Sequence, residues 1–167
     1  MPKIENINDF EQSLDYESRL NVVNCTICKE EIIKHSIYIY PIASDIYKHK
    51  PSKYFGIYSN KKVDTISEIK GVCEVDENEN ISAIWFNNDM TTREDLINIV
   101  KAKTEAFPDF RPIQVFVLDN FRDGINFQKG TPGGMFGSKK YFNFGNKFKS
   151  IDEFVDEIRN KTWNDFK

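Results

Sequence analysis

Short apolar runs of strand length, joined by polar turns, fill the centre of this 167-residue chain. Residues 36–41, 54–58, 63–75 and 81–86 form four such runs, and residues 59–62 form a turn between two of them. Apolar runs bounded by turn residues are typical of strands, and a short turn joins antiparallel neighbours. The pattern therefore predicts a largely antiparallel sheet.

Two segments carry the signature of capped amphipathic helices. The first begins at Thr91 or Thr92, with an acidic residue three positions later, and we expect Pro108 to end it. The second begins at Ser150, with Glu153 three residues later. Apolar residues at helical spacing follow both caps, which indicates that each helix packs one face on the core.

The remaining segments set the fold class. Residues 113–118 form a near-continuous apolar run that predicts a buried central strand, residues 141–144 predict an edge strand, and Gly71 is expected to mark a β-bulge. Strands and helices do not alternate strictly, so we expect an α+β fold: a mostly antiparallel sheet or pseudo-barrel flanked by amphipathic helices. No linker is evident, which predicts a single domain over residues 1–167, with residues 1–20 as an N-terminal helical arm.

The composition, with 40% hydrophobic and 29% charged residues, is ordinary for a globular protein. The N-terminus lacks the basic and apolar regions of a secretory signal, and no apolar run approaches the roughly 20 residues of a transmembrane helix. Three cysteines, Cys25, Cys28 and Cys73, fit reduced thiols better than a disulfide framework. We therefore expect a cytoplasmic protein with no membrane partner.

Positive charge is concentrated in one segment. The formal net charge is −3, but residues 124–151 contain five lysines and no Asp or Glu, which leaves −8 on the rest of the chain. Glycines and rings are interleaved there, and Lys139 and Lys140 directly precede Tyr141 and Phe142. Lysines bind phosphates and rings stack on bases, so the segment is typical of proteins that hold single-stranded or flipped-out nucleotides. A glycine turn leading into a lysine-protected edge strand explains the same residues without a ligand.

An alternative is Mg²⁺-dependent cleavage of nucleic acid. Glu68 and Lys70 would share one face of a strand, and Asp64 and Asp45 precede them. Nucleases of the PD-(D/E)XK type hold the metal with an Asp and the Glu of a Glu-x-Lys pair, and this sequence resembles them only in those residues. Asp64 is too close to Glu68 for the usual hairpin, and a Glu-x-Lys pair also occurs as a solvated pair on exposed strands.

Two other features of the sequence bear on function. Cys25 and Cys28 could bind zinc with His35 and His49, but a second closely spaced pair is missing, so we expect no metal and no cofactor. A protein-interaction module with an exposed aromatic patch is a third class of function. Whether the protein is an enzyme stays open at this point, although no nucleophile-and-base arrangement can be argued.

Residues 51–72, PSKYFGIYSNKKVDTISEIKGV, resemble the hairpin of PUA-like proteins in their aromatic and apolar spacing. That superfamily includes the EVE, ASCH and YTH domains, and similar hairpins occur in proteins linked to restriction and phage defence. The later central strand, basic Gly-rich loop and KKYF run are compatible with the same pseudo-barrel. The resemblance implies recognition of nucleic acid, often through a cavity that accepts a modified base, with Trp85 and Tyr54 as candidate walls.

We therefore expect a non-catalytic domain that binds DNA or RNA. The residues expected to contact phosphates are Lys129, Lys139 and Lys140. The candidates for stacking on a base or lining a base pocket are Tyr141, Phe142, Trp85 and Tyr54.

Overall fold

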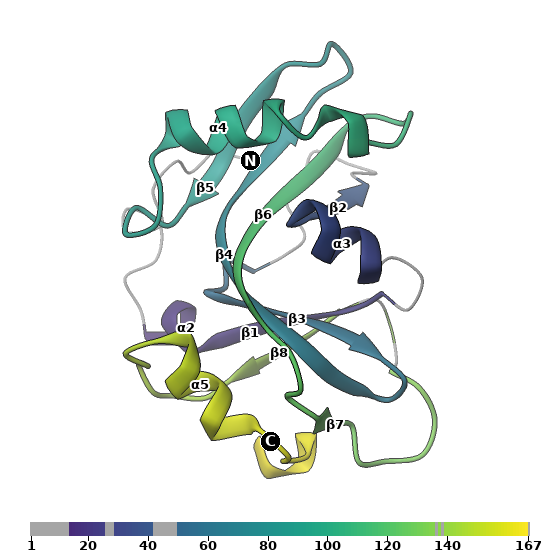
Figure 1. The fold of residues 1–167 in the computed structure, drawn as a ribbon, viewed down its shortest axis with the longest axis vertical. Helices are drawn as coiled ribbons and strands as arrows, with labels where there is room; N and C mark the ends of the chain where they lie inside the picture. Colours follow the sequence, from purple (N-terminus) through teal and green to yellow (C-terminus); the bar gives the residue numbers. More distant parts are fainter. Residues whose placement is uncertain (1–13, 26–28, 42–49, 136, 138, 167) are drawn as a thin grey trace. The chain divides into compact units, whose positions relative to one another are not determined.

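The computed structural model describes residues 14–25, 29–41, 50–135, 137 and 139–166. Its helices and strands (Figure 1) are α2 (Leu14–Glu17), β1 (Arg19–Asn24), α3 (Lys29–His35), β2 (Ile37–Pro41), β3 (Tyr54–Ser59), β4 (Lys62–Val75), β5 (Ile81–Phe86), α4 (Arg93–Lys101), β6 (Ile113–Arg122), β7 (Phe127–Gln128), β8 (Lys139–Asn143) and α5 (Ile151–Ile158). The described residues also form two short 3-10 helices, η1 (Thr104–Ala106) and η2 (Trp163–Phe166).

Eight strands form a mostly antiparallel, open sheet. The strand order is β2-β6-β4-β3-β1-β8, and β5 and β7 each pair with β4 outside this path. β1 and β3 run parallel, whereas β1 with β8, β2 with β6, and β4 with β3, β5 and β7 run antiparallel. The predicted α+β class with a mostly antiparallel sheet is confirmed. β8 ends the strand order, so the predicted edge strand is present, although it begins two residues earlier than expected.

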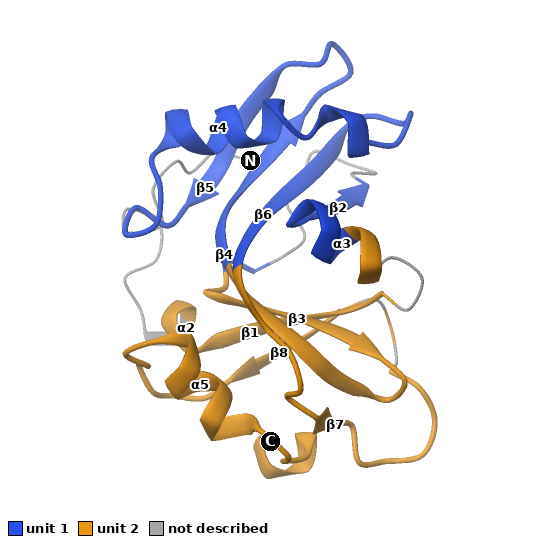
Figure 2. Cartoon of the chain, viewed as in Figure 1, with its two compact units in different colours: residues 1–12, 32–51, 69–119 blue, residues 13–31, 52–68, 120–167 orange. Residues whose placement is uncertain are grey.

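The chain forms two compact units, each assembled from three separate segments (Figure 2). Unit 1 contains residues 1–12, 32–51 and 69–119, and unit 2 contains residues 13–31, 52–68 and 120–167. Strands β4 and β6 contribute residues to both units. The chain passes repeatedly from one unit to the other, which explains why no linker is visible in the sequence.

Both predicted helix caps are confirmed. The side chain of Thr92 accepts the backbone N–H three residues on at 3.1 Å, and that of Ser150 does the same at 3.2 Å. These bonds satisfy N–H groups that have no partner within the helix. α4 ends at Lys101, well before Pro108, because the chain tightens into η1.

The apolar residues between positions 20 and 35 are spaced so that either one helix or a strand followed by a helical turn would fit. The structure shows the second arrangement, with β1 followed by α3.

Among the helices that the described residues form, none combines the length and apolar character that crossing a bilayer requires.

The cysteines correct one expectation. Cys25 is disulfide-bonded, so the prediction of reduced thiols is wrong for this residue. A cysteine count does not say which thiols are adjacent in space, and an odd count allows a pair and a remainder. Cys73 is that free thiol; it is buried, and burial raises its pKa to about 12.

Each unit has its own hydrophobic core. In unit 1, Leu96 and Val100 of α4 pack with apolar residues of β2, β4, β5 and β6. In unit 2, the buried face of α5 packs with residues of β1, β3, β4, β7 and β8. Aromatic rings dominate this second core, where Tyr54 stacks on Phe154 with ring centroids 4.0 Å apart. Many of the 14 Phe residues of the chain therefore pack in the core of unit 2.

Gly71 is required by close packing within unit 1. The predicted bulge lies one residue further along, where the register of β4 and β5 shifts between Val72 and Cys73. A Cβ atom on Gly71 would lie 2.8 Å from Leu96 Cδ2 and 2.8 Å from the Trp85 carbonyl oxygen. Only glycine therefore lets β4 approach both α4 and β5 at this point.

Replacing Gly71 by Ala should destabilise the protein by about 1–3 kcal/mol, because the added methyl group meets backbone as well as side chain. The matched control is Gly134→Ala, since nothing lies within 4 Å of a Cβ built there. Urea unfolding measures both variants. Equal midpoints for Gly71→Ala and the wild type would contradict the close approach.

Candidate functional site

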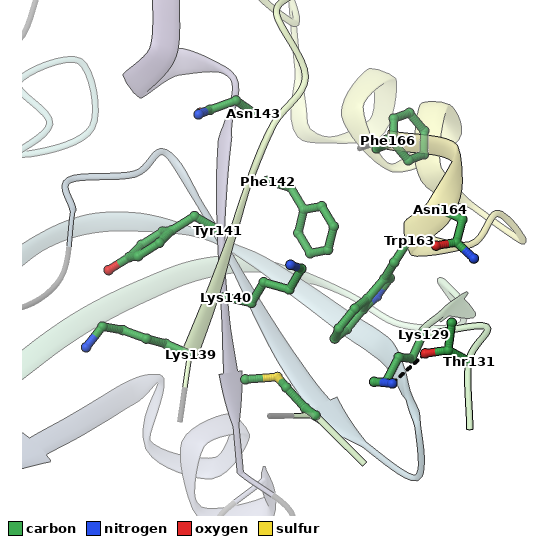
Figure 3. Close-up of a pocket in the computed structure, with 11 residues that line it drawn as sticks. Lys129, Thr131, Lys139, Lys140, Tyr141, Phe142, Asn143, Trp163, Asn164 and Phe166 are labelled. Atoms are coloured by element: carbon green, nitrogen blue, oxygen red, sulfur yellow. Dashed lines mark hydrogen bonds between the residues drawn. The ribbon is translucent and has the colours of Figure 1, made fainter. Parts of the chain in front are cut away.

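A cavity of about 690 Å³ lies beside β8 in unit 2 (Figure 3). This volume is within the range of small-ligand sites. The residues that line it are Lys129, Thr131, Met135, Lys139, Lys140, Tyr141, Phe142, Asn143, Trp163, Asn164 and Phe166. They come from β8, from the loop after β7 and from η2. The cavity thus brings together all three predicted lysines and two of the four predicted aromatic residues.

β8 distributes its side chains to two sides. Successive side chains of a strand point in opposite directions, and antiparallel pairing with β1 fixes the register of β8. Lys140 and Phe142 extend toward Trp163, whereas Lys139 and Tyr141 extend to the other side of the strand (Figure 3). The adjacent lysines Lys139 and Lys140 therefore place their ammonium groups on opposite sides of an edge strand.

Phe142 and Trp163 form an aromatic floor to the cavity. Their ring centroids are 5.3 Å apart with an interplanar angle of 68°, and Phe127 packs edge-on against Phe142, also at 5.3 Å. Edge-to-face pairs of this kind are favoured by the charge distribution of the rings. Phe142 and Trp163 expose only 5% and 6% of their surfaces. A base could stack on Phe142 only by opening the core.

Lys140 lies over this aromatic floor. Its Nζ is 5.3 Å from the ring centroid of Phe142 and 6.0 Å from that of Trp163. An ammonium group above a ring face is attracted by about 0.5–1 kcal/mol at an exposed site. The rings therefore position the charge of Lys140 at the cavity instead of leaving it to move freely in solvent.

Lys129 reaches the cavity from the loop after β7. Its backbone N–H donates to the Lys61 carbonyl at 3.0 Å, which continues the pairing of β7 with β4. Its Nζ donates to Thr131 Oγ1 and, at 3.4 Å, to the Pro132 carbonyl. Gly130, with φ of 77°, turns the chain between them. The loop thus holds this second ammonium group at the cavity.

Among the described residues of the lining, every charged side chain is a lysine. Three lysines line the cavity, and none of the lining residues within the described part of the chain is Asp or Glu. By contrast Lys147, which belongs to the same basic segment but not to the lining, forms an ion pair with Glu17 at 3.2 Å. Concave sites lined by one sign of charge concentrate counter-ions. The cavity is therefore suited to an anionic ligand.

Trp85 and Tyr54 do not line this cavity. Trp85 belongs to β5 in unit 1 and is 1% exposed, and Tyr54 belongs to the core of unit 2 and is 0% exposed. Burial, with Glu68 as the next contribution, raises the pKa of the Tyr54 hydroxyl above its usual range. Both residues are therefore core residues, and neither forms a cavity wall that a base could reach.

The residues of the nuclease alternative have structural partners. Asp64 accepts a backbone N–H at 3.1 Å, and Glu68 accepts a side-chain amide at 3.0 Å. Lys70 forms an ion pair with Asp119 at 3.5 Å. Asp45 lies outside the described residues. Within the described ranges, no group of three or more His, Cys, Asp or Glu could hold a metal ion.

Sequence reasoning missed the part of the site that η2 contributes. No motif in the sequence assigns Trp163, Asn164 or Phe166 to a binding site, although all three line the cavity. The available signal was weak: two aromatic residues follow the last turn of α5 at a spacing that fits a short helical turn. A long-range contact between η2 and β8 cannot be inferred from either segment alone.

Comparisons of this chain with protein-family models, with curated proteins and with solved structures find no match. The resemblance to PUA-like proteins therefore stays a prediction. The function has to be argued from the cavity itself.

The Tyr54 hydroxyl offers a test of its placement in the core. It is buried and has no hydrogen-bond partner in the described part of the protein. Removing an unsatisfied buried hydroxyl costs nothing, so Tyr54→Phe should unfold at the same or a higher urea concentration than the wild type. Tyr54→Ala, which also removes the ring stacked on Phe154, should lose about 3–5 kcal/mol. A clear loss of stability in Tyr54→Phe would show that the hydroxyl has a structural role.

Proposed function

We propose that this protein binds nucleic acid without catalysing a reaction, and that the cavity beside β8 is its binding site. The observation that carries the proposal is the lining, with Lys129, Lys139 and Lys140 around one cavity and no carboxylate among its described residues. Phosphates of nucleic acid are bound mainly by Lys and Arg, which release the counter-ions that surround them. In a chain of net charge −3, such a cavity is the place where a polyanion is attracted.

A single strand fits this site better than a duplex. Proteins read duplex DNA by placing a helix or a strand pair in a groove, whereas the lysines here surround a concave site at an edge strand. A flexible strand can enter a concavity and bend over an edge. Lys139 and Lys140, on opposite sides of β8, can then contact different phosphates of that strand.

Tyr141 is the residue best placed to stack on a base. It is half-buried, whereas Phe142, Trp85 and Tyr54 are all buried. Stacking of a base on an accessible ring contributes about 1–3 kcal/mol and tolerates any base. Tyr141 would thus add affinity with little sequence preference.

We further propose that the protein is related to the PUA-like superfamily. That resemblance implies recognition of nucleic acid through a cavity, in some proteins in the context of restriction or phage defence. The basic Gly-rich loop and the KKYF run that carry part of the resemblance both contribute residues to the cavity beside β8. A modified base as the recognised feature belongs to the same proposal.

Reversing two charges in the cavity tests the proposed function. Lys139→Glu with Lys140→Glu should weaken binding of a fluorescein-labelled single-stranded DNA or RNA about a hundredfold or more, because two charge-assisted contacts are lost. Stability should stay within about 1 kcal/mol, since substitutions of surface residues usually have small effects. Fluorescence anisotropy at fixed salt and thermal unfolding measure the two quantities.

The matched control is the double change Lys147→Glu with Lys149→Glu. It alters the net charge equally and lies in the same segment, but neither residue lines the cavity. We expect the control to retain most of the affinity. Equal loss in both variants would mean that net charge alone attracts the strand, and unchanged binding in the cavity variant would reject this site.

A further inference from the structure

The indole N–H of Trp163 is a buried donor without an acceptor. Trp163 exposes 6% of its surface and lines the cavity. Its Nε1 finds no hydrogen-bond partner in the part of the chain that the structure describes. Buried polar groups are almost always paired, so an exception requires an explanation.

On its core side, Trp163 packs against aromatic rings, and no described residue there accepts a hydrogen bond from its indole N–H. The rings of Tyr58, Phe142 and Phe127 surround it, with centroids 5.5, 5.3 and 6.4 Å from its own. The Tyr58 hydroxyl is itself buried and unpaired among the described residues, so it does not accept the indole N–H. Since the described residues supply no acceptor and Trp163 lines the cavity, a ligand in the cavity is the acceptor that the structure suggests.

The lysines near the indole favour a negatively charged hydrogen-bond acceptor. The ammonium of Lys140 lies 6.0 Å from the Trp163 ring centroid, and Lys129 lines the same cavity. In the view of Figure 3, the indole lies between these two lysines. An acceptor approached by an N–H and two cations is stabilised most when it is an oxyanion. Lys140 also covers the ring faces of the aromatic floor, so a base would have to displace it before stacking there.

We propose that Trp163 Nε1 donates a hydrogen bond to a phosphate oxygen of the bound strand, and that Lys140 neutralises the same phosphate. This inference rests on the proposed function and specifies which part of the ligand the cavity holds: the backbone phosphate and not the base. Nε1 has almost no accessible surface. Binding therefore requires the groups that cover Nε1 to move aside as the phosphate oxygen reaches the indole.

A strand without bases tests the proposal directly. An abasic single-stranded oligonucleotide keeps the phosphodiester backbone, so it should still bind, weaker than the normal strand of equal length only by the roughly 1–3 kcal/mol that stacking on Tyr141 contributes. A free nucleoside, which has a base and no phosphate, should not bind measurably at the same concentrations. Inorganic phosphate serves as the third probe, and it should bind far more weakly than the strand because it fills one position only.

The indole signals of the wild-type protein provide a second readout. The chain has two Trp residues, so a ¹H–¹⁵N spectrum contains two indole signals, which Trp163→Phe assigns. The Trp163 indole proton should move downfield when the abasic strand is added, while the buried Trp85 signal stays in place. Trp163→Phe, which retains a ring and loses the N–H, should bind the strand about tenfold or more weakly.

The outcomes separate this inference from the proposed function. If the normal strand binds but the abasic strand does not, or if adding the abasic strand does not move the Trp163 signal, the phosphate assignment is overturned and nucleic-acid binding stands. If inorganic phosphate moves the signal and the abasic strand does not, the cavity takes a small phosphate and the inference fails. If no strand binds at all, both proposals fail.

Discussion

The edge-to-face contact between Phe142 and Trp163 is the interaction on which the candidate site depends. It joins the edge strand β8 to the C-terminal segment η2, and Phe127 supports it from the core. Without it, one wall of the cavity would have no fixed place. The ammonium group of Lys140 lies over the same two rings. The packing of Phe142 against Trp163 therefore also determines where this positive charge lies.

Charge is distributed unevenly along the chain. The segment 124–151 carries five lysines without a carboxylate, and the rest of the protein carries −8. A polyanion is repelled by the net negative charge of that remainder and attracted by the lysines of the cavity. Lys147 of the same segment does not line the cavity and is paired with Glu17. Only the segment's three cavity lysines define the proposed site.

Much of the local structure could be predicted, because it depends on residues close in sequence. Thr92 and Ser150 cap their helices as expected, and the lysines expected to meet a ligand do share one cavity. The errors arise from contacts between distant segments. Nothing in the local pattern shows that Phe142 turns into the core, that Trp163 reaches β8, or that Lys139 and Lys140 lie on opposite sides of an edge. The same limit explains Cys25, whose disulfide depends on proximity and not on a count.

Lysine footprinting tests the central claim most directly, because it reports where a strand lies without any amino-acid substitution. Brief acetylation with and without a single-stranded oligonucleotide, read by mass spectrometry, compares every lysine in one sample. The account predicts strong protection of Lys129, Lys139 and Lys140, and unchanged acetylation of Lys147 and Lys149. Equal protection of all five, or protection elsewhere with these three still reactive, would contradict the account.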